Sequence, residues 1–119
     1  MEFQVDIWLR GDNYATTAVI VPVPRESSAW TEVDVVAVLE EMLRTLDCAK
    51  DPNMSPDRPV SLRGFSWSVS PFETGGVVIA LELTIGAVVA GPFDVFESAL
   101  STRIERVMGA QRPAAQTVH

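Results

Sequence analysis

The chain has 119 residues, of which 47% are hydrophobic and 21% charged, and its formal net charge is −7. These values fit a single globular domain that can bury a core, and the acidic excess argues against nucleic acid as a partner. With one cysteine, Cys48, and one histidine, His119, the chain has no internal disulfide, two-cysteine metal motif or histidine cluster. We therefore expect no metal site and no cofactor, and we favour a non-enzymatic function over an enzymatic one.

The N-terminal residues have neither the basic start nor the apolar stretch of a signal peptide. The most apolar segment runs from Gly75 to Phe93, and it is too short and too interrupted for a membrane-spanning helix, because it contains Glu82, Gly86 and Gly91. These features predict a cytoplasmic protein that has no membrane contact.

The first half of the chain predicts two strands and a helix. Residues 3–9 alternate apolar and polar side chains, the pattern of a half-buried strand. Residues 16–23 are rich in β-branched side chains and predict a second strand, which Pro22 and Pro24 end or place at a sheet edge. Residues 31–48 have apolar side chains at helical spacing behind a threonine that can cap the helix.

The second half repeats this order after a proline-rich loop over residues 51–59. Residues 60–72 predict a third strand, and a shift in its apolar parity indicates a β-bulge at Gly64. A connection at residues 73–76 leads to a fourth, long strand over residues 77–85, which is expected to bend or end near Gly86.

A second helix is predicted directly after Gly91 and Pro92, since proline fits the first turn of a helix. Its apolar stripe begins at Phe96, and Gly109 can end it. The element order is therefore β-β-α-β-β-α. It predicts an α+β fold in which two ββα units form a four-stranded, mostly antiparallel sheet with both helices packed on one face. Residues 1–109 would form this domain, and residues 110–119 a flexible tail.

The string from Arg63 to Trp67 resembles the start of the RNP1 motif of RNA-recognition domains, whose strand aromatics stack on bases. The resemblance stops at Ser68 and Ser70, where that motif has apolar and aromatic residues. The predicted order also lacks the helix that follows the first strand in those domains. Together with the acidic charge, these departures argue against RNA binding.

Trp8 lies on the polar side of the first predicted strand, among Gln4, Asp6 and Arg10. An exposed tryptophan is a favoured anchor for a partner, although a loop or an arginine chain can also cover it. On the fourth predicted strand, the alternation places Glu82 on the outward-facing side as well. It is interpreted as a solvated residue or an ion-pair partner of an arginine, ahead of a catalytic carboxylate paired with Asp6. The candidate binding face consists of Asp6, Trp8, Arg10, Arg63 and Glu82.

Three functions remain open on this basis. The first is an interaction protein, homodimeric through the open sheet face or docking a protein partner there. The second is a small-ligand or enzymatic domain with a pocket between helices and sheet. Its lining candidates, Trp30, Met42, Trp67 and Met108, also fit simple core packing. The third is an acidic inhibitor or immunity-type protein, in which five acidic side chains of the first helix bind a basic partner.

Overall fold

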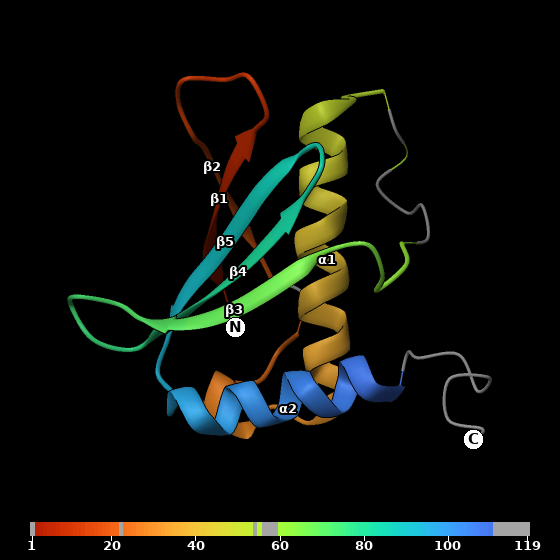
Figure 1. The fold of residues 1–119 in the computed structure, drawn as a ribbon. Helices are drawn as coiled ribbons and strands as arrows, with labels where there is room; N and C mark the ends of the chain where they lie inside the picture. The colour runs from red at the N-terminus through yellow and green to blue at the C-terminus, as the bar shows by residue number, and fades with distance from the viewer. Residues whose placement is uncertain (1, 22, 54, 56–59, 111–119) are drawn as a thin grey trace.

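The computed structural model describes residues 2–21, 23–53, 55 and 60–110. It shows an α+β fold in which an antiparallel sheet carries two α-helices (Figure 1). The elements in chain order are β1 (Phe3–Leu9), β2 (Thr16–Ile20), the 3-10 helix η1 (Ser27–Ala29), α1 (Glu32–Lys50), β3 (Ser66–Pro71), β4 (Val77–Leu83), β5 (Gly86–Phe93) and α2 (Glu97–Ala110).

The sheet has five strands in the order β2-β1-β5-β4-β3, so the prediction of four strands is wrong. The predicted fourth strand is present as β4, which ends at Leu83, and the chain turns at Thr84 and Ile85, close to the bend expected near Gly86. The unexpected strand is β5, formed by residues 86–93, to which the sequence pattern assigned no strand. The apolar run continues through the turn, which hides the reversal from a pattern search. Three strands therefore lie between α1 and α2, and the two-fold ββα repeat is not confirmed.

Two other predicted boundaries change. The third strand is shorter than expected, so Gly64 lies in a bend outside it. The register irregularity falls instead in the β4–β5 pairing, where the three steps from Ala90 to Phe93 on β5 face two steps on β4. Pro92 belongs to β5, whose last residue pairs with the first residue of β4. This pairing delays the second helix to Glu97 and leaves Phe96 in front of the helix, 82% exposed.

The helix predicted at residues 31–48 is confirmed as α1, and its first turn forms as the sequence indicates. Thr31 is the N-cap: its hydroxyl accepts the Asp34 N–H at 3.3 Å, and the Asp34 carboxylate accepts the Thr31 N–H at 3.0 Å. Arg25, from the preceding loop, donates to the same carboxylate at 2.6 Å. This capping box satisfies N–H groups that the first helical turn leaves unpaired.

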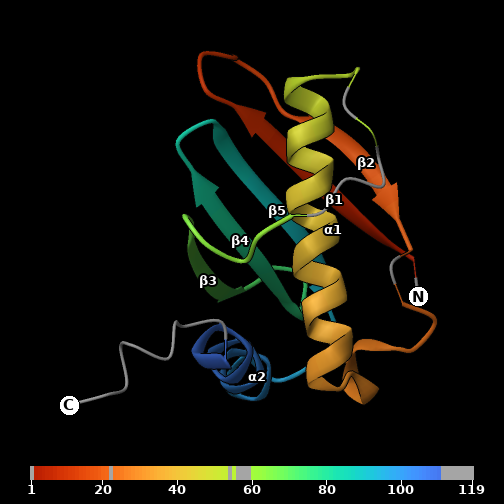
Figure 2. The same cartoon turned by 90° about the vertical axis from the view of Figure 1, so that its right-hand side faces the viewer.

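The hydrophobic core lies between one face of the sheet and the helices. α1 crosses that face over β1 and β5, and α2 packs beside β3 near the start of α1 (Figure 2). Phe3, Trp30 and Phe93 form an aromatic cluster within this core, with the ring of Phe93 4.9 Å from each of the other two. α2 continues to Ala110, and residues 111–119 of the predicted tail lie outside the described residues.

Candidate functional site

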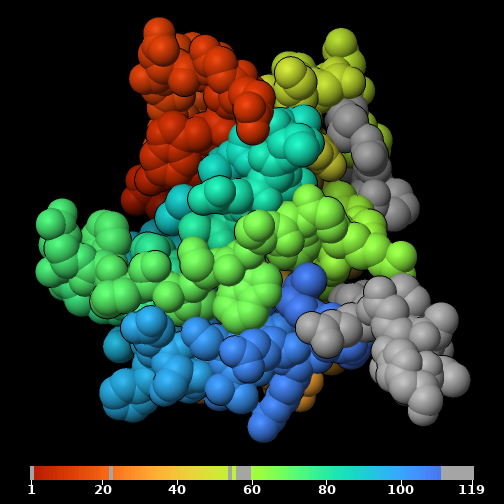
Figure 3. Space-filling model, in the orientation of Figure 1, coloured from red at the N-terminus to blue at the C-terminus, as the bar shows by residue number. Residues whose placement is uncertain are grey.

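The second face of the sheet carries no helix, and its centre is apolar. In the space-filling view β4 and β5 reach the surface between β1 and β3 (Figure 3). Antiparallel sheets with one solvated face normally alternate apolar side chains inward with polar ones outward. Here the outward positions of the central strands β4 and β5 break that rule. Four of them, Val78, Ala80, Ala87 and Val89, are apolar and only partly buried, whereas Glu82 is charged and exposed.

The strand pairing places Trp8 at one end of this apolar centre. Trp8 on β1 faces Ala87 on β5, and Ala87 faces Glu82 on β4, so the three residues form one row across the sheet. Trp8 is 40% exposed, and no aromatic ring contacts it among the described residues. The sheet edges beside this row are mostly polar: Gln4, Asp6 and Thr17 lie on one side together with the exposed Val19, and Ser66, Ser68 and Ser70 on the other. We use the name open face for the residues of this row and of both edges, together with the four apolar residues above.

Arg10 is fixed at the end of the open face by the β4–β5 turn. Its Nε donates to the Thr84 carbonyl at 2.7 Å, and its backbone N–H donates to the Ile85 carbonyl at 2.9 Å. Arg10 and Glu82 line a shallow hollow of about 260 Å³ next to Trp8. They also line a second hollow of about 480 Å³ that reaches Gly64 and Ser66. The Trp8 ring, the hollow beside it and the opposite charges of Arg10 and Glu82 therefore lie together at this end of the open face.

Asp6 and Glu82 are not a catalytic pair in this structure. They lie on β1 and β4 with β5 between them and differ by two residues in register, which corresponds to roughly 12 Å between their Cα atoms. Asp6 instead accepts a hydrogen bond from the Thr17 hydroxyl at 2.7 Å. Arg63 is exposed in the segment before β3, next to Gly64 of the larger hollow.

The four residues considered for a pocket between helices and sheet lie in or against the core. Trp30 and Met42 are 2% and 0% exposed, and Trp67 and Met108 pack against the core as partly buried side chains. None of the four lines either of the two hollows beside Arg10. The Trp30 indole N–H donates to the Arg25 carbonyl at 3.1 Å, which satisfies its only donor. Trp67 points to the helix side of β3, so the open face presents serines where base-stacking aromatics would stand.

The acidic face of α1 is partly occupied by partners within the chain. The Asp34 carboxylate binds Arg25 and the helix N-cap, and Glu41 pairs with Arg44 at 3.1 Å. Thus two of the five acidic side chains that favoured a basic partner serve the fold itself. Over the part of the chain that the structure describes, no three metal-binding side chains converge on one point. No helix in that part is long and apolar enough to cross a bilayer.

Two features of the surface escaped prediction from the sequence. One is the position of β5 between β1 and β4, which brings Ala87 and Val89 beside the apolar residues of β4 on the open face. The other is a pocket of about 520 Å³ at the start of α2, lined by Phe96 and Arg103 among others. The only sequence signal for that pocket is the apolar Phe96 in an otherwise polar helix start, and helical periodicity assigned it to the core instead.

Comparison of the chain with models of protein families, with curated proteins and with solved structures found no match.

Proposed function

We propose that this protein is a binding protein without catalytic activity that forms a homodimer through its open face. The observation that carries the proposal is the apolar strip Val78, Ala80, Ala87 and Val89 beside the exposed Trp8. Contiguous apolar surface of this kind, with a polar margin, is typical of protein interfaces. Trp8 would supply the aromatic anchor that such interfaces favour.

A second copy of the chain fits this face better than an unlike partner, because the face is complementary to itself. A two-fold interface brings the same patch from both copies together, so a protruding side chain of one copy must fit into a hollow of the same patch on the other copy. Trp8 is the protruding side chain, and the hollow of about 260 Å³ lies beside it. Arg10 and Glu82 border that hollow, so the Arg10 of each copy can meet the Glu82 of the other.

The size of the face sets the expected strength of the dimer. Five strands of about seven residues cover on the order of 500 Å² per copy. That is near the lower limit for specific interfaces, where affinities are weak and association is reversible. We expect a dimer with a dissociation constant in the micromolar range.

Sedimentation equilibrium over a micromolar-to-millimolar concentration series tests the proposal. Trp8→Ser should raise the dimer dissociation constant by about 30-fold, the cost of losing an aromatic anchor. Ala80→Arg places a charge at the centre of the open face, where it reaches water in the monomer but would be buried in the dimer, so it should abolish the dimer. Tyr14→Ser removes an exposed aromatic ring outside the open face and should leave the dissociation constant unchanged.

Two outcomes would overturn the proposal. The first is a wild-type protein that stays monomeric throughout the series. The second is a dimer that survives both Trp8→Ser and Ala80→Arg, since such a dimer must form elsewhere, for example along the edge of β2 or β3.

A further inference from the structure

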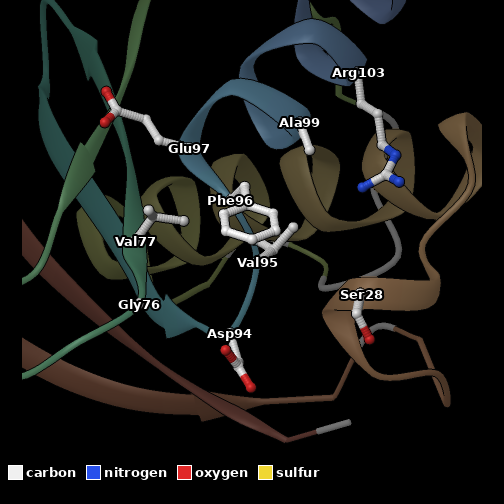
Figure 4. A pocket seen from close by; sticks show the side chains of 9 residues that line it. All are labelled: Ser28, Gly76, Val77, Asp94, Val95, Phe96, Glu97, Ala99 and Arg103. Atoms are coloured by element: carbon white, nitrogen blue, oxygen red, sulfur yellow. The ribbon is translucent and has the colours of Figure 1, made fainter.

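The pocket of about 520 Å³ at the start of α2 lies away from the open face. Its walls come from η1, the start of β4, the β5–α2 connection and the first two turns of α2, and no residue of the open face lines it. In Figure 4, Val95 and Phe96 lie in the middle of the side chains that line the pocket, and the Arg103 side chain extends toward them from α2. Asp94 lies on another side, and Glu97 points away from the others. Its volume is in the range of small-molecule sites.

Arg103 is the unusual residue of this pocket. Its Nη1 atom is buried and has no hydrogen-bond partner among the described residues. A buried donor without an acceptor costs free energy, and a charged one costs more, so native structures rarely keep one without a reason. Asp94 and Glu97 line the same pocket, yet within the described ranges no ion pair joins either carboxylate to Arg103. The Nη1 donor therefore lacks an acceptor within these ranges, and an anion from outside the chain that reaches it would supply one.

The rest of the pocket supplies apolar surface. Phe96 is 82% exposed, the largest exposed fraction among the big hydrophobic side chains that the structure describes. Val77, Val95 and Ala99 complete the apolar lining, and the Ser28 hydroxyl adds one neutral donor. A few polar groups that fix orientation within mostly apolar walls are typical of ligand sites.

We propose that this pocket binds a small organic monocarboxylate with an aromatic or aliphatic body. The carboxylate would accept hydrogen bonds from the Arg103 guanidinium, whose planar N–H groups match the two carboxylate oxygens. A rotation of the arginine side chain would bring Nη1 to this acceptor. The apolar body would lie against Phe96 and Val95. Asp94 selects against multiply charged anions such as phosphate, because each added negative charge increases the repulsion by its carboxylate.

The proposal is tested by titrating the wild-type protein with phenylpropanoate while amide chemical shifts are recorded by NMR. Phenylpropanol has the same body without the charge, and inorganic phosphate has the charge without the body. We expect phenylpropanoate to bind with a millimolar dissociation constant, as suits a fragment of its size, and to shift amides of the β5–α2 connection and α2. Phenylpropanol and phosphate should each bind at least tenfold more weakly.

Two substitutions, each with a matched control, assign the contacts. Arg103→Gln should weaken phenylpropanoate binding at least tenfold, whereas Arg106→Gln, on an exposed arginine of the same helix, should not. Phe96→Ser should weaken it severalfold, whereas Tyr14→Ser, on another exposed ring, should not. Both Phe96 and Tyr14 are largely outside the core, so the folded state is expected to survive these changes.

The proposal is overturned if phenylpropanoate does not bind in the millimolar range or shifts amides elsewhere in the sheet. Phosphate binding as tightly as phenylpropanoate would overturn the choice of an apolar monocarboxylate, since the pocket would then be a plain anion site. Equal loss of binding in Arg103→Gln and Arg106→Gln would show a diffuse charge effect and would equally refute the assignment. Because the lining excludes the open face, these results do not depend on whether the protein dimerises.

Discussion

Gly86 lies directly against the backbone of Trp8. A Cβ atom built on Gly86 would stand 2.1 Å from the Trp8 carbonyl oxygen and 3.0 Å from the Cα of Leu9, both of them backbone atoms that cannot move aside cheaply. The backbone of Gly86 also has a φ of 153°, a conformation that residues with a side chain rarely adopt. The glycine therefore lets β5 approach β1 at the point where Trp8 faces the open surface.

Gly86→Ala should consequently destabilise the protein by about 3 kcal/mol, through steric overlap and an unfavourable φ. Urea denaturation followed by circular dichroism measures this change. Gly109→Ala is the matched control: nothing lies within 4 Å of its Cβ position, and it sits near the end of α2, so it should be neutral or slightly stabilising. Equal effects of the two substitutions would contradict the proposed packing of β5 on β1.

The capping box of α1 predicts a graded loss of stability. Thr31→Ala removes one hydrogen bond to the first turn and should cost about 1 kcal/mol. Asp34→Ala removes the bond to the Thr31 N–H and the ion pair with Arg25, and since Asp34 is only 5% exposed the loss should reach about 2–3 kcal/mol. The order of the two midpoints in urea is the test, and a smaller effect for Asp34→Ala would contradict it.

The aromatic cluster predicts a large contribution of Phe93 to the stability of the core. Phe93 is fully buried and its ring packs edge-on against Phe3 and Trp30. Phe93→Ala should cost about 4 kcal/mol, and Phe93→Leu about 1–2 kcal/mol. The near-ultraviolet circular dichroism of the tryptophans, to which Trp30 contributes, should fall with Phe93→Leu while the secondary structure persists. An unchanged tryptophan signal would contradict the close packing of Trp30 against Phe93.

Arg103 should lower the stability of the ligand-free protein, which is a consequence independent of any ligand. Replacing a buried, unpaired guanidinium nitrogen by an apolar chain of similar length removes its desolvation cost. Arg103→Met should therefore raise the free energy of unfolding by about 1 kcal/mol. The control, Arg106→Met on an exposed arginine, should change it little. Marked destabilisation by Arg103→Met alone would mean that the guanidinium supports the fold.

The local elements were predictable wherever one stretch of sequence contained the whole signal. The alternation from Phe3 to Leu9 specifies β1, and Thr31 with Asp34 specifies the start of α1 through contacts within three residues. The outward position of Trp8 follows from the same alternation, since neighbouring side chains on a strand point to opposite faces. The sequence predicts a bend near Gly86 but not the return strand β5, because Thr84 and Ile85 are not a residue pair that favours tight hairpins.

The sequence by itself determined an acidic α+β chain with few reactive side chains and an exposed tryptophan on its first strand. Only the tertiary structure decided which residues surround that tryptophan. Strand order is a long-range property: β5 enters between β1 and β4, brings Ala87 between Trp8 and Glu82, and separates Asp6 from Glu82. Likewise, Arg103 and Ser28 are distant in sequence, and they line one pocket only because η1 and α2 pack at the same end of the sheet. Side-chain periodicity determines the face on which a residue lies, but its neighbours across the sheet depend on pairing between distant segments.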